Sequence, residues 1–434
     1  MSLLFLFLPF SSLFFRLFLI LSLAVWPFGK SASENSGSET VPLKKSAYDL
    51  PEQPDQYGFI KILILNGAPE ITVATPGAYH ILDDRSRTVF KASSIPSALD
   101  TADGDVLQIG IQPFHSNPVT LVSEGKGIKV QGASYRHALE IWREADGKLT
   151  VINDIPIEEY LKGVLPSEVN PHWPMESLKA QAIASRTYAL FKMIENRHQR
   201  YHLSKDVLSQ VYGGKGREHS LSNRAVEMTQ GQILTYQGKI FPAYFHSTCG
   251  GHTTHAEYLW PVEPHPALEG VECNFCWKSK HYRWTAEIPA AEIEKKLQAR
   301  RIQASGLTNM TLEDKDETGR ARFIGIETAA GKTKIHSNDF RIWVDPMKFK
   351  STWIQSLEKK NGIFVFKGRG WGHGVGLCQF GIKQLGEMGY TADKMLYYYY
   401  PGSQITQYWT EQPKSIESSL RNFVGLVKEK LELE

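Results

Sequence analysis

The chain has 434 residues, of which 42% are hydrophobic and 22% charged, and its formal net charge is +3. This composition is that of a globular protein with a sizeable core and excludes a disordered chain. The small net charge gives no reason to expect a nucleic-acid partner. Ten tryptophans and eighteen tyrosines suit carbohydrate stacking and an aromatic core equally.

The N-terminal residues 1–28 are almost wholly apolar, and Arg16 is their only charged residue. Such a run predicts either a cleaved signal peptide or an N-terminal membrane anchor. Both alternatives stay open, because Lys30 makes a poor cleavage site while Pro9 and Arg16 interrupt a single membrane span. Residues 29–57 are small and polar and predict a flexible linker. We therefore expect an exported protein, in the periplasm or at the outer face of the cytoplasmic membrane.

From residue 58 onward the pattern changes to short runs of β-branched and aliphatic residues separated by Gly, Pro, Asn or Asp. Residues 60–65, 106–111 and 139–142 are examples of such runs. They are typical of short strands between turns. The sequence thus predicts a small β-rich unit over residues 58–150.

Residues 151–405 predict a larger mixed domain, so the expected fold class is mixed α/β (α+β), with strand-end loops forming a groove. Asp154 caps a predicted short helix that ends at Gly163, and Pro174 opens a longer one. Glu168 lies in the loop between them. Further helices are expected at 221–231, 290–301, 338–343 and 379–388, and strands at 233–236, 240–245, 323–327, 332–336 and 363–367. The tail, 406–434, is amphipathic and predicts a final helix.

Three segments share polar, glycine-rich loops at predicted strand or helix ends: the Glu168 loop, 246–255 and 368–381. The last has six glycines in fourteen residues, a density that indicates unusual backbone dihedrals or a close approach to another group. Neither a Gly-Lys-Ser/Thr motif nor a dinucleotide-binding βαβ unit is present, so we expect no nucleotide or organic cofactor.

Four motifs occur in a recognisable order: Pro-Ser-Glu-Val at 166–169, Leu-Lys-Ala-Gln-Ala-Ile-Ala-Ser-Arg-Thr-Tyr-Ala-Leu at 178–190, His-Ser-Thr-Cys-Gly-Gly at 246–251, and the glycine-rich run at 368–381. Together they resemble the stage II sporulation protein D (SpoIID/LytB) family of cell-wall enzymes, over about residues 60–405. The resemblance implies a lytic transglycosylase that cleaves peptidoglycan glycan strands, preferably strands stripped of stem peptides by a partner amidase. It implies Glu168 as the catalytic residue. The family usually has Ser where Cys378 stands, so no role is carried over to that side chain.

Many glycosidases need two carboxylates, but a lytic transglycosylase can work with one. The 6-hydroxyl of the sugar attacks C1 and leaves a 1,6-anhydro-MurNAc end. Glu168 would first donate a proton and then accept one, which requires a pKa near neutrality. We therefore expect a partly desolvated Glu168 beside Trp173. Glu176 is the weaker candidate, because the helix N-terminus favours its ionised form.

The residues expected to contact substrate come from three segments. They are Gln181, Arg186 and Tyr188 on the helix, His246, Ser247 and Thr248 at a strand end, and Trp371 and His373 in the glycine-rich loop. The alternatives are solvated helix residues for the first set and a glycine-packed turn for the last. Loops on a rigid scaffold favour direct contact.

A second group, Cys249, His252, Cys273 and Cys276, has ligand spacing for a structural zinc ion. His255 could replace His252. Zinc is known in part of the family that the chain resembles. The alternative is a disulfide between two of the cysteines, since an exported chain meets oxidising conditions. Cys378 is expected to be a small buried residue.

Three functions remain in competition. The first is the lytic transglycosylase, serving cell division, sporulation or general remodelling. The second is a non-catalytic wall-binding protein that enhances an amidase. The third is an ordinary two-carboxylate hydrolase, whose products would have reducing ends.

Overall fold

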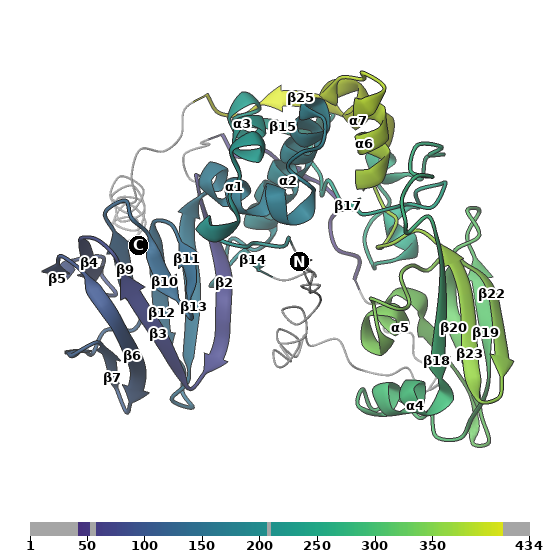
Figure 1. Ribbon diagram of the computed structural model, residues 1–434, viewed down its shortest axis with the longest axis horizontal. Helices are drawn as coiled ribbons and strands as arrows, with labels where there is room; N and C mark the ends of the chain where they lie inside the picture. Colours follow the sequence, from purple (N-terminus) through teal and green to yellow (C-terminus); the bar gives the residue numbers. More distant parts are fainter. Residues whose placement is uncertain (1–41, 53–57, 206–209, 411–434) are drawn as a thin grey trace, which may run out of the picture. The chain divides into compact units, whose positions relative to one another are not determined.

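The computed structural model describes residues 42–52, 58–205 and 210–410, and only the backbone of 96–103. The predicted signal peptide or anchor at 1–28 lies outside these ranges, as do most of the linker at 29–57 and most of the tail at 406–434. The described chain is mixed α/β, as predicted, with helices and several sheets (Figure 1).

Two large sheets account for the β-rich first part of the described chain. One has the order β14-β2-β13-β12-β9-β4-β5 and the other β11-β10-β3-β6-β7-β8 (Figure 1). Neighbouring strands are antiparallel, except that β14 runs parallel to β2. The strands are β2 Phe59–Ala68, β3 Glu70–Thr75, β4 Tyr79–Leu82, β5 Thr88–Ala92, β6 Ile95–Asp103, β7 Val106–Ile109, β8 Gln112–Phe114, β9 Val119–Ser123, β10 Ile128–Val130, β11 Ala133–Tyr135, β12 Ala138–Arg143, β13 Leu149–Pro156 and β14 Leu203–Ser204.

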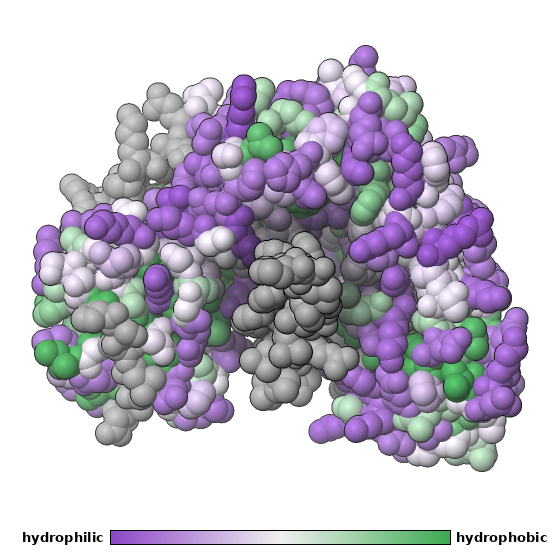
Figure 2. Space-filling model, in the orientation of Figure 1, coloured by the Kyte–Doolittle hydropathy of each residue, from purple (hydrophilic) through white to green (hydrophobic). Residues whose placement is uncertain are grey.

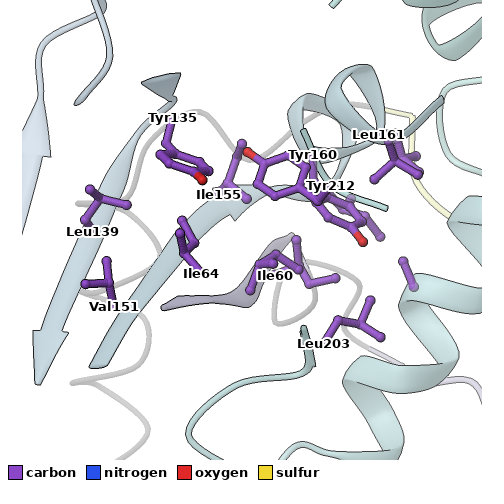
Figure 3. Packing of buried hydrophobic residues seen from close by; sticks show 14 of the residues in the cluster. Ile60, Ile64, Tyr135, Leu139, Val151, Ile155, Tyr160, Leu161, Leu203 and Tyr212 are labelled. Carbon is purple, nitrogen blue, oxygen red and sulfur yellow. The ribbon is translucent and has the colours of Figure 1, made fainter. Parts of the chain in front are cut away.

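Alternate residues of β2 enter one core. Ile60 and Ile62 have no exposed surface and Ile64 is 4% exposed, as expected for one face of a strand. The same cluster contains Tyr160 and Leu161 from the first helix. Figure 3 shows Ile60, Ile64 and Tyr160 in this cluster. The β-rich part and the first helices therefore share a core.

Helix α2 (Met175–Glu195) is buried along most of its length, unlike an amphipathic surface helix. It packs against α1 (Ile157–Glu168), α3 (Ser220–Met228) and a four-stranded sheet of order β1-β16-β15-β25. Pro174 is the N-cap of α2, one residue from the predicted start. The four strands are β1 Tyr48–Asp49, β15 Gln232–Tyr236, β16 Lys239–Ile240 and β25 Gln404–Gln407.

Two three-stranded sheets, β18-β23-β22 and β19-β20-β21, form a further part with helices α4 and α5. Its core contains Phe340, Phe349 and Phe366, and Phe349 lies 5.3 Å from Phe340 and 5.0 Å from Phe366 between ring centroids. The elements are β18 Arg283–Pro289, α4 Ala290–Gln298, β19 Leu307–Lys315, β20 Ala321–Thr328, β21 Gly331–His336, α5 Ser337–Val344, β22 Ile354–Lys360 and β23 Ile363–Arg369.

A short parallel pair joins two distant motifs. Strand β17 (Phe245–His246) pairs with β24 (Leu377–Cys378), and β24 leads directly into α6 (Gln379–Glu387) and then α7 (Ala392–Tyr399). Since the two strands lie side by side, the loop after β17 meets the loop before β24.

Several boundaries differ from the predictions. Helix α1 does not stop at Gly163 but continues to Glu168, so the acid ends a helix instead of lying in a loop. Gly163 serves a close approach: a Cβ there would lie 2.7 Å from the Tyr212 ring. Residues 404–407 form a strand, and the second hairpin strand is only Lys239–Ile240. Strands β18, β19 and β22 and helix α7 lacked a predicted counterpart.

The surface shown in Figure 2 is mostly hydrophilic, with apolar residues in small scattered groups. This agrees with the burial of the large apolar residues in three clusters. Within residues 42–52, 58–205 and 210–410, no helix is both long and apolar enough to cross a membrane.

Candidate active site

Glu168 is the last residue of α1, and its side chain is partly buried. Its Oε1 accepts a hydrogen bond from the backbone N–H of Val211 at 2.8 Å, and its Oε2 accepts one from the Gln379 amide at 3.3 Å. Burial raises the pKa of Glu168, and the two hydrogen bonds oppose this without cancelling it. The negative end of the helix dipole also disfavours the carboxylate. Both partners are neutral, so neither holds the group ionised.

The Val211 N–H is fixed by the residues on either side of it. Gln210 is fully buried, and its Oε1 accepts a hydrogen bond from the Tyr160 hydroxyl at 3.0 Å. The Tyr212 hydroxyl donates to Asn153 at 2.9 Å, and its ring lies 5.0 Å from that of Tyr160. Figure 3 shows the two tyrosines next to each other. The donor to the acid is therefore preorganised.

Gln379, the second donor, is the first residue of α6 and is 6% exposed. The start of α2 anchors this helix. Ser177 donates to the Ile382 carbonyl at 2.8 Å, and the ring of Trp173 lies 5.4 Å from that of Phe380. Trp173 was predicted to lie beside the acid, and its ring contact is to the residue that follows Gln379.

The three α2 side chains predicted to bind substrate are buried. Arg186 has no exposed surface and forms a two-pronged ion pair with Glu158 at 2.8 and 2.7 Å. Gln181 is also fully buried and donates to Ser185 at 3.1 Å, and Tyr188 is 7% exposed. This burial argues against the predicted substrate contacts of Arg186 and Gln181. Because α2 is enclosed, most of its polar groups bond to other buried groups, although the Gln181 Oε1 has no hydrogen-bond partner among the described residues.

The loops after β17 and before β24 meet in a small ladder. Thr248 and Trp371 exchange backbone hydrogen bonds of 3.0 and 2.7 Å. Thr248 is 1% exposed, whereas Ser247 and Trp371 are half-buried. The Phe380 N–H donates to the Ser247 carbonyl at 3.0 Å. These two predicted segments are thus brought next to α6, which carries the donor to the acid; their contact with substrate stays a prediction.

The two histidines of these loops are buried, and burial lowers the pKa of each. Burial, and secondarily Arg320, lowers the pKa of His246 to about 3, and its Nδ1 donates to the Val375 carbonyl at 3.0 Å. Burial also lowers the pKa of His373 well below its ordinary value. Its Nδ1 accepts from the Val375 N–H and its Nε2 donates to the Phe245 carbonyl. Both nitrogens of His373 are engaged, which leaves none for a ligand.

Four buried free cysteines, Cys249, Cys273, Cys276 and Cys378, form one cluster whose sulfur atoms all lie within 4.8 Å of one another. The predicted set named His252 in place of Cys378. That prediction needs correction, because the parallel pairing of β17 and β24 brings Cys378 in from 129 residues away, and the Cys249 N–H donates to its sulfur at 3.3 Å. His252 instead contacts the Thr253 carbonyl.

The cluster fits a metal ion on two observations of the structure. Four thiol ligands are the donor set of structural zinc sites. A buried cation, Arg320, lies beside them: it is 2% exposed and donates to the carbonyls of Cys249 and His252 at 2.7 and 2.9 Å. Its Nε and Nη1 have no hydrogen-bond partner within the described residues. Negative charge at the sulfur atoms would compensate this cation.

Sequence reasoning missed Val211, Gln379, Cys378 and Arg320 as members of these sites. Gln379 and Cys378 lie in the glycine-rich motif. The motif predicted that this segment lies near the site, but it did not predict what either side chain does there. A backbone N–H such as that of Val211 has no side-chain signature. Nothing in the residues around Arg320 distinguishes it from a surface arginine.

Comparison with known proteins matches residues 145–236 to a family described as Stage II sporulation protein and residues 271–376 to a domain of unknown function. An uncharacterized protein of Brachyspira hyodysenteriae is 33% identical over 283 residues, 65% of this chain and 75% of that protein. Stage II sporulation protein D of Bacillus subtilis is 32% identical over 277 residues, 59% of this chain and 76% of its own length. The amidase enhancer of Bacillus subtilis is 24% identical over 378 residues, 73% of this chain and 52% of that protein.

Proposed function

The chain belongs to the stage II sporulation protein D family and has a cell-wall-related role, and from this premise we propose that it is a lytic transglycosylase of peptidoglycan. Its substrate is the glycan strand, preferably one that an amidase has stripped of stem peptides. Glu168 is the acid and base of the reaction. This role requires export, which the predicted signal peptide or anchor at 1–28 would provide.

Glu168 donates one proton in the first step of the reaction and accepts one in the second. The protonated Glu168 donates its proton to the glycosidic oxygen as the bond from that oxygen to C1 of MurNAc breaks. The resulting carboxylate then accepts the proton of the 6-hydroxyl as its oxygen bonds to C1. The products are a 1,6-anhydro-MurNAc end and a new free hydroxyl, and no water is consumed.

The environment of Glu168 is the observation that supports this proposal. A general acid must be protonated near neutral pH, and here burial and the helix C-terminus both favour the protonated form. The Val211 N–H and the Gln379 amide would stabilise the carboxylate formed in the first step. Because both hydrogen-bond donors are neutral, Glu168 can act first in its protonated form as the acid and then in its ionised form as the base.

The test is an analysis of products from denuded and from intact peptidoglycan. Mass spectrometry should find anhydro-muropeptides from denuded strands with the wild-type chain and none with Glu168→Gln. Reducing ends would instead support a two-carboxylate hydrolase. Release of anhydro products by Glu168→Gln at the wild-type rate would falsify the assignment of the acid.

The second candidate is a non-catalytic protein that binds the wall and enhances an amidase. The similarity to the amidase enhancer of Bacillus subtilis favours it. In that case the purified chain would release no glycan fragments alone. It would raise the rate of an added amidase, and Glu168→Gln would raise it equally.

We also propose a structural metal ion, of which zinc is the first candidate. Its ligands would be Cys249, Cys273, Cys276 and Cys378. Such an ion would cross-link segments that are distant in the sequence, and it would take no part in the reaction. Elemental analysis should find about one zinc ion per chain. A disulfide found by mass, with no metal, would remove the ion from the proposal.

A further inference from the structure

One peptide bond and one hydrogen bond connect the cysteine cluster to the acid. Cys378 belongs to the cluster and is the N-cap of α6, and the next residue, Gln379, donates its side-chain amide to Glu168 at 3.3 Å. Both are largely buried, Cys378 fully and Gln379 at 6% exposure. The position of the Cys378 backbone therefore determines where the Gln379 amide can reach.

The β17–β24 ladder and burial in an apolar cluster place the Cys378 backbone, but the Cys378 side chain has only weak partners within the described residues. Its sulfur accepts a hydrogen bond from the Cys249 N–H at 3.3 Å, and β24, which contains it, has only two residues. Sulfur is a weak hydrogen-bond acceptor, and four neutral thiols have little mutual attraction. Bonds from four thiolates to one ion would fix this corner far more firmly.

The charge beside the cluster agrees with a bound ion. Four thiolates and a divalent cation carry a net charge of −2, which is costly to bury without compensation. Arg320 is a buried cation that donates to the Cys249 carbonyl and has two further nitrogens without a partner in the described chain. Asp316 and the Trp353 ring, which lies 5.0 Å from the guanidinium, already favour this charge, and thiolates at the cluster would compensate it further.

The cluster also joins separate segments. Cys273, Cys276 and Arg320 lie within the matched domain of unknown function at 271–376, whereas Cys249 and Cys378 lie outside it. An ion bound by all four thiolates would fix the domain of unknown function to the start of α6.

We infer that a metal ion on Cys249, Cys273, Cys276 and Cys378 controls the catalytic acid, by holding the start of α6 so that Gln379 stays on Glu168. The inference rests on the proposed metal ion and on Glu168 as the acid. Gln379 is a positioning residue here: it stabilises the carboxylate after proton transfer. Loss of the ion would loosen only the start of α6, because the Ser177 hydroxyl still holds the Ile382 carbonyl. The Gln379 amide would then withdraw and leave the acid with the Val211 N–H.

The experiment uses Cys276→Ser, because Cys276 is a cluster member about one hundred residues from α6 in sequence. Trp277→Ala is the matched control, since Trp277 is the neighbouring residue and is 60% exposed. Elemental analysis should find the ion in the wild type and in Trp277→Ala and find it missing in Cys276→Ser. Retention of the full metal content by Cys276→Ser would overturn the site.

Amide hydrogen exchange reads the coupling without any activity. In Cys276→Ser, and in wild-type protein stripped by a chelator, residues 377–382 should exchange at least about tenfold faster, while α3 stays unchanged. Added zinc should restore the stripped protein. The stripped wild type keeps the test valid if the variant does not fold. Unchanged exchange after metal loss would overturn the inference.

The pH profile gives the second readout. The Gln379 amide lowers the pKa of Glu168, so removing it should move the alkaline limb of kcat/KM to higher pH. Gln379→Ala and metal-free protein should show the same shift. A shift in Gln379→Ala alone would overturn the coupling. If even the wild type releases no glycan, the proposed function fails, while metal content and exchange still test the link.

Discussion

The two ends of α1 carry two glutamates with opposite environments. Glu158, in the first turn, is 2% exposed and pairs with Arg186, and it also accepts hydrogen bonds from the Gly231 N–H and the Trp409 indole at 3.0 and 3.2 Å. Glu168, in the last turn, is partly exposed and has two neutral donors. The helix dipole favours an anion at the first position and disfavours it at the second.

The comparison shows what separates a structural carboxylate from a candidate acid. Burial alone does not, because Glu158 is the more buried of the two. The difference lies in the partners: Glu158 forms an ion pair with a guanidinium, whereas Glu168 has two neutral hydrogen-bond donors. Substitutions at Glu168, Arg186 and Glu176 test this contrast.

The largest effect is expected from Glu168→Gln. It removes the proton donor while keeping the shape of the side chain, so glycan release should fall by about 10²- to 10⁴-fold. The rate on denuded peptidoglycan measures this. A loss of less than about tenfold would mean that another group donates the proton.

The next effect is on stability and comes from the other end of α1. Arg186→Met leaves the Glu158 carboxylate buried without a cation and should lower the free energy of unfolding by about 3 kcal/mol or more. Chemical denaturation measures it. The double variant Glu158→Gln/Arg186→Met should recover part of the loss, and a single-variant cost below about 1 kcal/mol would contradict a buried ion pair.

A smaller, pH-dependent effect follows from the raised pKa of Glu168. In the unfolded chain the group ionises near pH 4.3, below its folded pKa. Its contribution to stability is complete below about pH 4.3 and is lost as pH rises through the folded pKa. The free energy of unfolding of Glu168→Gln minus that of the wild type should therefore increase between about pH 4 and neutral pH. A difference that does not change with pH would contradict the raised pKa.

The smallest effect is expected from Glu176→Gln, the matched control. Burial acts to raise the pKa of Glu176, but hydrogen bonds from Lys179 and the Ala392 N–H prevail and lower it. This stabilisation is present above about pH 4.3 and is lost as pH falls through the folded pKa. At neutral pH the variant should lose roughly 0.5 kcal/mol of stability and keep its activity. A large loss of glycan release in this variant would indicate that Glu176, and not Glu168, is the catalytic acid.

Much of the secondary structure could be predicted from the sequence where the pattern is periodic. The start of α2, the helices α4, α5 and α6, and the hairpin β20–β21 lie within a few residues of their predicted positions. The boundary of α1 was wrong, because a glycine reads as a helix end unless one knows that the Tyr212 ring packs against it. Strands such as β19 and β22, with exposed polar faces, carry too little periodicity to be recognised.

The sequence by itself determined the family motifs, the mixed fold class and the position of Glu168 within a motif, because these depend on residue type and local spacing. Only the tertiary structure decided the partners. Gln379 reaches Glu168 from 211 residues away, and Cys378 takes the place predicted for His252. Local spacing cannot predict either, since such contacts depend on which strands pair and how the helices pack. Likewise, an arginine on a helix reads as exposed until the packing on every side of α2 is known.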